Sequence, residues 1–387
     1  MKKKICVLTA TRAEYGLLRL IIEKLNSVSE FDVKLAVTGT HLSEQFGLTY
    51  HEIEEDGFDI DTKIHIIQNS DLPSDISKTM GTALIQFGEY FEHTCPDALL
   101  VLGDRYETLA VCCAAMNARI PILHLYGGET TEGALDEAIR HSITKMSYLH
   151  FTSTEEARKR VIQLGEEPDR VFCVGSLGIE NSQNIKLMTR NELTVNLSIP
   201  ADRPYAVVTF HPATLGNDKP EDQMLELLKA CERHPELFYL FTKANADSGG
   251  LRINQMIDEF ADKHENVMAF DSLGSLRYLS ALNYCEMVIG NSSSGLIEAP
   301  TFGVPTINIG DRQKGREQST SVINSNTNEN DISLAIAKAM SENFKAVAKA
   351  CINPYGDGNT SDKILTVIKD YLQNNKIQLS KSFYNLV

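Results

Sequence analysis

The sequence predicts an α/β protein made of two doubly wound domains, each a parallel β-sheet with helices on both faces. Three observations predict this fold class. Short, nearly continuous apolar runs alternate with amphipathic helical patterns, which is typical of buried parallel strands joined by helices. The alternation stops in a polar stretch at residues 179–204 and then begins again. The 387 residues of the chain are enough for about two domains of ordinary size.

Six strands are predicted in the first half of the chain. Each is a short run rich in β-branched or other apolar residues. Between the runs lie helical patterns, such as the one from Leu17 to Leu25, whose apolar residues fall on one face. The predicted strands are Ile5–Ala10, Val33–Thr38, Ala98–Leu102, Ile120–Leu125, Leu149–Thr152 and Val171–Val174.

Five further strands are predicted after the polar stretch, again with helices between them. A single large sheet is the alternative reading. Two domains are favoured because the polar stretch contains four asparagines and Pro200, and because each half has its own series of strands. The predicted strands are Ala206–Phe210, Phe238–Phe241, Val267–Phe270, Met287–Ile289 and Thr306–Ile309.

We therefore expect three segments along the chain. An N-terminal Rossmann-like domain spans residues 1–178, and a C-terminal Rossmann-like domain spans residues 200–360. A helix over Ser361–Asn374 and a short tail make up residues 361–387, where apolar side chains recur at helical spacing. One option for this last segment is to pack back on the N-terminal domain.

Charge and cysteine content narrow the class of protein. The chain has 37 basic and 52 acidic residues, a formal net charge of −15, which argues against a nucleic-acid partner. The apolar run after Lys2-Lys3-Lys4 is too short for a signal peptide or a membrane span, so we expect a cytoplasmic protein with no membrane partner. The eight cysteines are scattered without a CxxC pair, which indicates reduced thiols and no metal site.

Candidate functional residues in the first half lie where predicted strands end, because ligands bind outside the carboxyl ends of parallel strands and two such domains face a shared cleft. The first strand is followed by Arg12 in a segment that is not GxGxxG, so the nicotinamide dinucleotide fingerprint is absent. Arg12 suits a phosphate beside a helix start, or equally an ion pair. The strand Ala98–Leu102 is followed by Asp104 and Arg105, which indicate either a catalytic position or a local salt bridge.

The next strand end carries a denser group of polar residues. Gly127-Gly128 would let the backbone approach a ligand, and Glu129 follows directly. On a helix, Asp136 and Arg140 stand four residues apart and share a face. Neighbouring carboxylates can have split pKa values, so that one site supplies both an acid and a base. The alternative is a solvated acidic helix start favoured by the helix dipole.

In the second half, His211 follows the first predicted strand and could transfer a proton or bond the backbone. The strongest local signal is Gly290-Asn291-Ser292-Ser293-Ser294-Gly295, a strand–turn–helix pattern that presents amides and hydroxyls to an anion. It lacks the lysine of a Walker A motif. Glu298, one turn into the predicted helix, could accept hydrogen bonds from a ribose diol, and Arg312 offers a second guanidinium. The alternative is a merely well-capped helix.

Taken together, these motifs resemble the UDP-N-acetylglucosamine 2-epimerase family, whose members share the GT-B fold. The resemblance runs from Ile5 to about Ile368 and is greatest to the hydrolysing branch, which supplies sialic and legionaminic acid biosynthesis. The GGE and DEAIRHSITK segments carry that assignment, because non-hydrolysing relatives show HxEAGLRT followed by PEExNR. The matching motifs are TxxRAEYG, GDR, HLYGGExxxGALDEAIRHSITK, FHP, GNSSSGLIE and INIGDRQKGRE.

The resemblance implies roles for individual residues. Asp104 and Asp136 match catalytic carboxylates, and His211 matches a histidine that assists the departure of UDP. Relatives often have a catalytic glutamate where this chain has Tyr126, so either Glu129 supplies the carboxylate through a shifted loop or Tyr126 has another role. The remaining matches are UDP contacts at Arg12, Ser292, Ser293, Glu298 and Arg312, and cleft residues at Arg105, His211 and Asn245.

The activity implied is the conversion of a UDP-hexosamine to UDP and a free manno-configured sugar, without a metal or other cofactor. UDP leaves C1 as a base removes the C2 proton, and water then adds to the resulting 2-acetamidoglucal. The substrate is UDP-N-acetylglucosamine or UDP-2,4-diacetamido-2,4,6-trideoxyglucose, and the family suggests a homo-oligomer, a dimer or a tetramer. The alternatives are a non-hydrolysing epimerase, a GT-B glycosyltransferase and a catalytically inactive nucleotide-sugar sensor.

Overall fold

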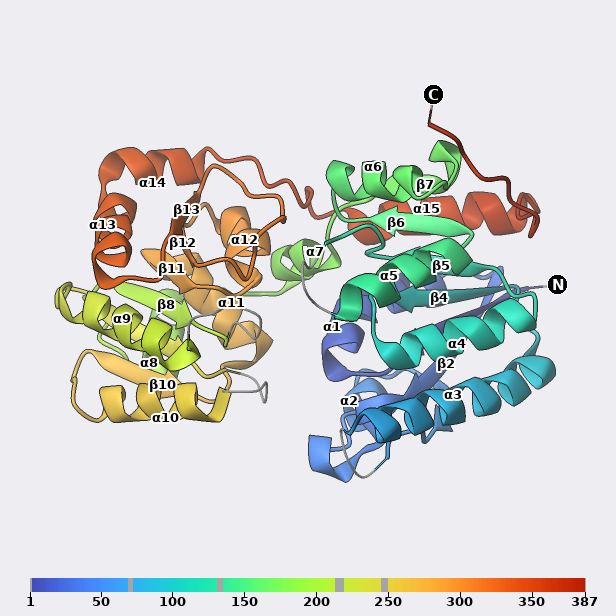
Figure 1. The fold of residues 1–387 in the computed structure, drawn as a ribbon, viewed down its shortest axis with the longest axis horizontal. Helices are drawn as coiled ribbons and strands as arrows, with labels where there is room; N and C mark the ends of the chain where they lie inside the picture. The colour runs from blue at the N-terminus through green and yellow to red at the C-terminus, as the bar shows by residue number, and fades with distance from the viewer. Residues whose placement is uncertain (1, 69–71, 131–134, 213–218, 245–249, 387) are drawn as a thin grey trace. The chain divides into compact units, whose positions relative to one another are not determined.

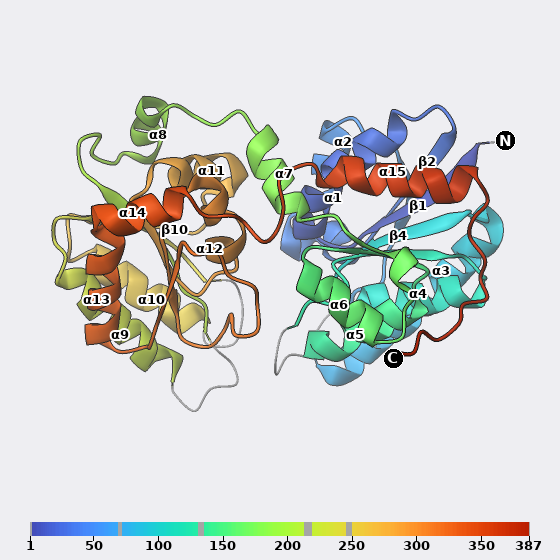
Figure 2. The same ribbon diagram turned by 90° about the horizontal axis from the view of Figure 1, so that it is seen from above.

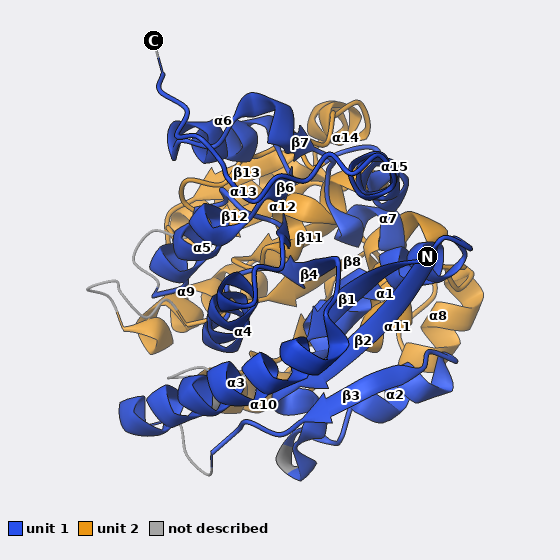
Figure 3. Cartoon of the chain, turned by 90° about the vertical axis from the view of Figure 1, so that its right-hand side faces the viewer, with its two compact units in different colours: residues 1–181, 356–387 blue, residues 182–355 orange. Residues whose placement is uncertain are grey.

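The computed structural model describes residues 2–68, 72–130, 135–212, 219–244 and 250–386. The chain divides into two compact units, coloured separately in Figure 3. Unit 1 consists of residues 1–181 and 356–387, and unit 2 of residues 182–355. Unit 2 is therefore inserted into the sequence of unit 1, so that the chain passes between the units twice.

Unit 1 is built on a seven-stranded sheet in the order β3-β2-β1-β4-β5-β6-β7, and every neighbouring pair described is parallel (Figure 1). The strands are β1 (Lys3–Thr9), β2 (Phe31–Thr38), β3 (Ile60–Ile64), β4 (Ala98–Leu102), β5 (Ile122–Leu125), β6 (Leu149–Thr152) and β7 (Val171–Cys173). The helices are α1 (Arg12–Asn26), α2 (Tyr50–Glu55), α3 (Pro73–Thr94), α4 (Tyr106–Asn117), α5 (Leu135–Met146), α6 (Glu155–Gln163), α7 (Leu177–Asn184, which continues into unit 2) and α15 (Thr360–Gln373).

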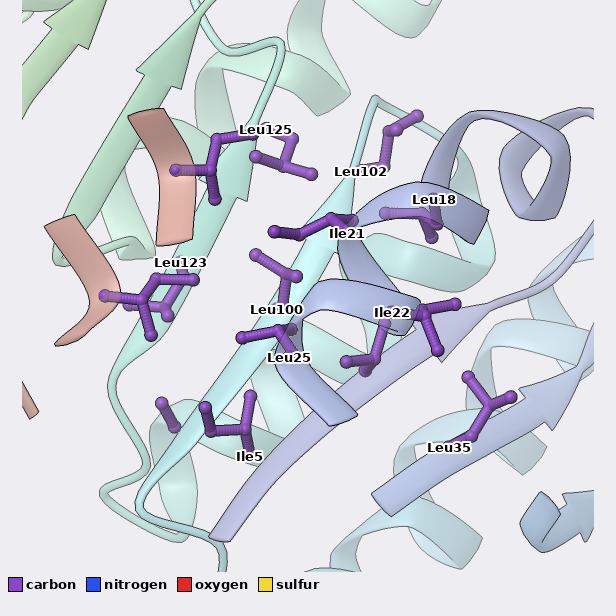
Figure 4. Packing of buried hydrophobic residues seen from close by; sticks show 14 of the residues in the cluster. Ile5, Leu18, Ile21, Ile22, Leu25, Leu35, Leu100, Leu102, Leu123 and Leu125 are labelled. Atoms are coloured by element: carbon purple, nitrogen blue, oxygen red, sulfur yellow. The ribbon is translucent and has the colours of Figure 1, made fainter. Parts of the chain in front are cut away.

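Alternation along β1 shows why this sheet is covered on both faces. Ile5 and Val7 belong to the cluster formed with α1 and α15, whereas Cys6 and Leu8 belong to the cluster formed with α3, α4 and α5. Successive side chains of a strand point to opposite faces, so an all-apolar strand needs helices on both. Figure 4 shows the first cluster, where Leu25 of α1 lies over the sheet.

Unit 2 has a six-stranded parallel sheet in the order β10-β9-β8-β11-β12-β13. Its two faces are covered by α9, α10 and α13 on one side and by α8 and α11 on the other. The strands are β8 (Tyr205–Thr209), β9 (Phe238–Thr242), β10 (Val267–Phe270), β11 (Met287–Gly290), β12 (Thr306–Ile309) and β13 (Val322–Ser325). The helices are α8 (Arg190–Leu197), α9 (Pro220–Glu232), α10 (Gly250–Ala261), α11 (Gly274–Tyr284), α12 (Ser294–Ile297), α13 (Glu329–Met340) and α14 (Glu342–Lys349).

Two strands of the structure are absent from the sequence prediction. Both β3 and β13 lie at a sheet edge, and both include exposed positions among their residues. With the sequences IDTKI and VINS, both lack the mostly apolar run by which the other strands are recognised. The polar stretch at 179–204 also contains helix, because Thr189 and Glu192 form a capping box that starts α8.

The chain returns to unit 1 at residue 356. The expected boundary of the C-terminal domain, residue 360, lies four residues later. Thr360 donates to the Ser176 carbonyl at 3.2 Å, and Ser361 donates to the buried carboxylate of Glu180. From there α15 packs against α1, as Figure 2 shows, and buries Ile368 with the α1 side chains.

The tail after α15 is held to unit 1 by a buried glutamate. The carboxylate of Glu166 accepts hydrogen bonds from Lys381 Nζ at 2.9 and 3.0 Å, from His150 Nε2 at 3.2 Å and from Lys145. Burial alone would raise the pKa of Glu166, but hydrogen bonds from these three partners outweigh burial and lower the pKa to about 2. The carboxylate is therefore ionised and fully engaged at neutral pH.

Lys381→Ala is expected to lower the free energy of unfolding by about 1–3 kcal/mol at neutral pH, because a buried carboxylate loses a charged donor. Because the pKa of Glu166 is lower in the folded protein, its ionised carboxylate stabilises the fold at pH values above the ordinary pKa of 4.5. This contribution is lost as the pH falls towards 2. Urea unfolding should therefore show a large difference between variant and unaltered protein at pH 7 and a small one near pH 3. Exposed Lys263→Ala is the control, expected within about 0.5 kcal/mol. An equal difference at both pH values would contradict this assignment.

No helix within the described ranges is long and apolar enough to cross a lipid bilayer.

Candidate active site

Arg140 organises the carboxyl edge of the unit 1 sheet. Its side chain is about 5% exposed and donates to the carboxylate of Asp104, which follows β4. It also donates to the Glu129 carbonyl at 2.8 Å and to the Glu137 carboxylate at 3.0 Å. One buried guanidinium thus joins the loop after β4, the loop after β5 and the first turn of α5.

Asp136 lies in the first turn of α5, beside this cluster. Its pKa is raised, first by burial and then by the negative charge of Asp104, while Arg140 and Arg105 act in the opposite direction. The carboxyl groups of Asp104 and Asp136 therefore interact. A carboxyl whose pKa is raised can hold and release a proton nearer neutral pH than an ordinary aspartate.

His124 holds the backbone next to this cluster. It is fully buried, and burial lowers its pKa to about 3, so the ring is neutral. Nε2 lies 2.8 Å from the Gly103 carbonyl oxygen. Since a carbonyl only accepts, Nε2 carries the proton and donates it. His124 therefore fixes the backbone just before Asp104.

Tyr126 points into the core of unit 1. Its backbone has a φ of 67°, and its ring packs with the cluster shared by α1 and β1. The hydroxyl accepts from the Leu177 N–H at 2.7 Å and lies 3.2 Å from Ser176 Oγ. The Tyr126 hydroxyl thus anchors the start of the segment that enters α7.

Glu129 lies three residues further along, in the loop after β5. Its Oε1 accepts from Ser153 Oγ at 2.7 Å, and its carbonyl is held by Arg140. A carboxylate is thus present close to the residue that replaces the usual glutamate.

The double glycine before Glu129 has a packing reason that the sequence did not reveal. A Cβ on Gly128 would lie 2.3 Å from the Ala157 carbonyl oxygen, and one on Gly127 would lie 2.9 Å from His124 Nδ1. Close packing of the loop on α6 and His124 thus accounts for both glycines without a ligand.

Arg12 begins α1 and is exposed. Its Nε lies 3.1 Å from Glu52 Oε1, which is the ion pair considered as the alternative to a phosphate contact.

In unit 2, Asn291 joins the ends of three adjacent strands. Its Oδ1 accepts from the His211 N–H at 2.7 Å, and its Nδ2 donates to the His211 carbonyl at 2.8 Å, which fixes the end of β8. Its own carbonyl accepts from Arg312 at 3.0 Å and from Gln313 at 2.8 Å, after β12. Sequence reasoning did not single out Asn291, although its place directly after a strand was the available signal.

The turn after β11 is tighter than the sequence suggested. Gly290 has a φ of 134°, and a Cβ there would lie 1.9 Å from the Thr209 carbonyl oxygen. The helix that follows, α12, has only four residues, so Glu298 stands at its end and not one turn into a longer helix. Ser292 and Ser293 are half-buried at its start.

Burial raises the pKa of Glu298 to about 7, with a hydrogen bond from Ser294 acting against it. Asn245, matched to the cleft by resemblance, lies outside the described residues. Among the described residues, no group of three or more His, Cys, Asp or Glu side chains is arranged to hold a metal ion.

Comparison with known proteins identifies the family of this chain. The family model described as UDP-N-acetylglucosamine 2-epimerase matches residues 23–369. This chain belongs to the UDP-N-acetylglucosamine 2-epimerase family. The family that the motifs resemble is thereby confirmed.

Curated relatives of this epimerase-family chain include two that are 42% identical. One, from Campylobacter jejuni, is named GDP/UDP-N,N'-diacetylbacillosamine 2-epimerase (hydrolyzing), with 89% of each chain covered. The other is polysialic acid biosynthesis protein P7 from Escherichia coli. The match to this protein spans 99% of this chain and 98% of the relative.

Solved structures confirm the predicted GT-B fold class for this member of the family. The UDP-GlcNAc 2-epimerase of Neisseria meningitidis, solved bound to UDP-GlcNAc, superposes with a TM-score of 0.82 over 95% of this chain and 100% of its own. Its sequence identity is 18%, so the likeness concerns the fold.

Proposed function

We propose that this chain is a hydrolysing UDP-sugar 2-epimerase, which releases UDP and a free manno-configured sugar. The observation that carries the proposal is the pair of acidic groups at the carboxyl edge of the unit 1 sheet. Asp104 is fixed by Arg140, and Asp136 has a raised pKa beside it. A relative named as a hydrolysing epimerase, 42% identical to this chain, supports the same reaction class.

We assign proton transfer at C2 of the sugar to unit 1. Asp136 removes the C2 proton while the C1–O bond to UDP breaks, and the C2–H electron pair forms the C1=C2 bond of a 2-acetamidoglucal. Water then adds its oxygen to C1, and a proton reaches C2 from the opposite face. Asp104 and Glu129 are the further carboxyl groups available for that second transfer.

We assign binding of UDP to unit 2, and we assign Arg12 and Arg105 to contacts with the UDP-sugar. Ser292 and Ser293 present hydroxyl groups suited to the diphosphate, and Glu298 suits the ribose diol. His211, held at the end of β8 by Asn291, assists the departure of UDP. Donors aimed at a departing diphosphate stabilise the charge that develops in the transition state.

The sugar is UDP-N-acetylglucosamine or UDP-N,N'-diacetylbacillosamine, the 2,4-diacetamido-2,4,6-trideoxy sugar, for sialic or legionaminic acid biosynthesis. Purified protein should be incubated with each in deuterated water and followed by NMR. The expected result is free UDP with one deuterium at C2 of the released sugar, and ¹⁸O from labelled water at C1. UDP-N-acetylmannosamine without free UDP would show a non-hydrolysing epimerase. A sugar that keeps its C2 hydrogen would exclude elimination and addition.

UDP alone is expected to raise the melting temperature. A ligand that binds only the native state stabilises it by about 2.7 kcal/mol at a hundredfold excess over Kd. The double variant Ser292→Ala, Ser293→Ala should reduce the shift, and exposed Ser29→Ala should leave it unchanged. An unaltered melting curve at saturating UDP would overturn the nucleotide site.

A further inference from the structure

The buried carboxylate of Glu107, at the start of α4, accepts a hydrogen bond from Arg105. Glu107 is 2% exposed, and its Oε1 accepts from Arg105 Nε at 2.5 Å. The Arg105 side chain remains about 39% exposed. Because the hydrogen bond uses Nε, the N–H groups of the two terminal nitrogens stay available for other acceptors.

A second carboxyl group completes this cluster from α1. Glu14 is 7% exposed, and its Oε2 accepts from the N–H groups of Ala10 at 2.7 Å and Thr11 at 3.2 Å. The other oxygen, Oε1, and Oε2 of Glu107 are both buried without a hydrogen-bond partner among the described residues. Two such acceptors so close to the candidate active site require an explanation.

The charges of Glu14, Glu107 and Arg105 bear on these unpaired oxygen atoms. Burial raises the pKa of Glu14 to about 7, and repulsion from Glu107 adds to this while Arg105 opposes it, so the three groups interact. With both carboxyls ionised, the cluster would hold two buried negative charges against one guanidinium. A proton on Glu14 leaves one matched pair of charges, Glu107 with Arg105.

We propose that Glu107 is a positioning residue that holds the Arg105 guanidinium for an oxygen atom of the substrate, with Glu14 as the second carboxyl group of the cluster. This inference rests on the proposed function. Arg105 follows Asp104 directly, and its charge acts on Asp136, so the guanidinium lies where the substrate reacts. Neither glutamate contacts the substrate in this account, since both act through Arg105.

A double-mutant cycle tests the proposal. The kcat/KM for UDP release should be measured for Glu107→Gln, Arg105→Gln and the double variant. We expect Glu107→Gln to lower kcat/KM about tenfold in the unaltered protein and less than about twofold when Arg105 is already replaced. If the loss of kcat/KM in the double variant equals the product of the losses in the two single variants, the residues act independently and the proposal is overturned. Glu54→Gln, which removes a carboxylate from an exposed pair with Lys63, is the matched control and should change nothing.

Further variants separate positioning from folding. The kcat/KM of Glu14→Gln should stay within about threefold of that of the unaltered protein, because the amide is neutral like the protonated acid and its oxygen can still accept from the Ala10 and Thr11 N–H groups. A tenfold loss with an unchanged melting temperature would overturn the neutral role of Glu14. If Glu107→Gln does not fold, Glu107→Asp keeps the charge on a shorter side chain and enters the same cycle.

Binding measurements keep the two proposals distinguishable. The cycle can also be read from the dissociation constants of UDP and of UDP-N-acetylglucosamine, without turnover. Weaker UDP binding in Glu107→Gln identifies a phosphate oxygen as the group that Arg105 holds. A change confined to the UDP-sugar identifies an oxygen of the sugar. A protein that binds both ligands but releases no UDP would refute the proposed function while leaving this cycle readable.

Discussion

Asp136→Asn is expected to lower turnover by about 10²–10⁴-fold, the usual cost of removing a positioned acid–base group, while UDP binds as tightly as before. The amide keeps the shape of the side chain but cannot take up the C2 proton. The raised pKa of Asp136 adds a pH signature, because a base acts only when ionised. Turnover of the unaltered protein should rise with pH through a value above that of an ordinary aspartate.

The measurement is the initial rate of UDP release, with deuterium at C2 as the second readout. Asp370→Asn serves as the control, because it makes the same substitution on the surface of α15, where Asp370 pairs with Lys376. Near-normal turnover by Asp136→Asn, or a loss of UDP binding equal to the loss of rate, would show that Asp136 is not the base.

Arg140→Met should destabilise unit 1 by about 3 kcal/mol, near the lower end for breaking a buried ion pair, and should abolish turnover. The substitution keeps the apolar stem but leaves the carboxylate of Asp104 and the carbonyl of Glu129 without their shared donor. Arg140→Lys should recover part of the stability only, because a single ammonium cannot reproduce the guanidinium fork.

Urea unfolding gives the free energy of unfolding of each variant. Arg252→Met is the control, since Arg252 is about half exposed and lies 3.8 Å from Glu259, a surface pair worth under about 1 kcal/mol. If Arg140→Met unfolds at the same urea concentration as this control, Arg140 does not organise the sheet edge.

Most strands were predictable because they are short and mostly apolar runs, as burial under helices requires. Residues Leu149–Thr152 and Val267–Phe270 form strands with the bounds expected. The edge strand Val322–Ser325 gave no such signal, since its polar residues face away from the core. The length of α12 was also unreadable, because a helix that ends after one turn begins like a longer one.

Contacts at the site were likewise predictable within one helix but not between segments that are distant in sequence. Residues four apart on a helix share a face, and the side chains of Glu137 and His141 on α5 accordingly lie 3.1 Å apart. The hydrogen bond between Arg140 and Asp104 spans 36 positions in sequence, so it depends on how β4 and β5 pair and not on any local pattern. The inward direction of Tyr126 likewise depends on Leu177, far along the chain. The roles assigned to the site residues remain predictions.

The insertion of unit 2 into unit 1 reverses the usual order of folding during synthesis. All of unit 2 leaves the ribosome before α15, so unit 2 can complete its cores while unit 1 still lacks the helix that packs on α1. At about 5–20 residues per second, this wait lasts on the order of ten seconds. Throughout it, the face of α1 that Ile364 and Ile368 later cover is open to chaperones. A chain that ends before residue 356 would lack α15, so this face of α1 would stay exposed after synthesis.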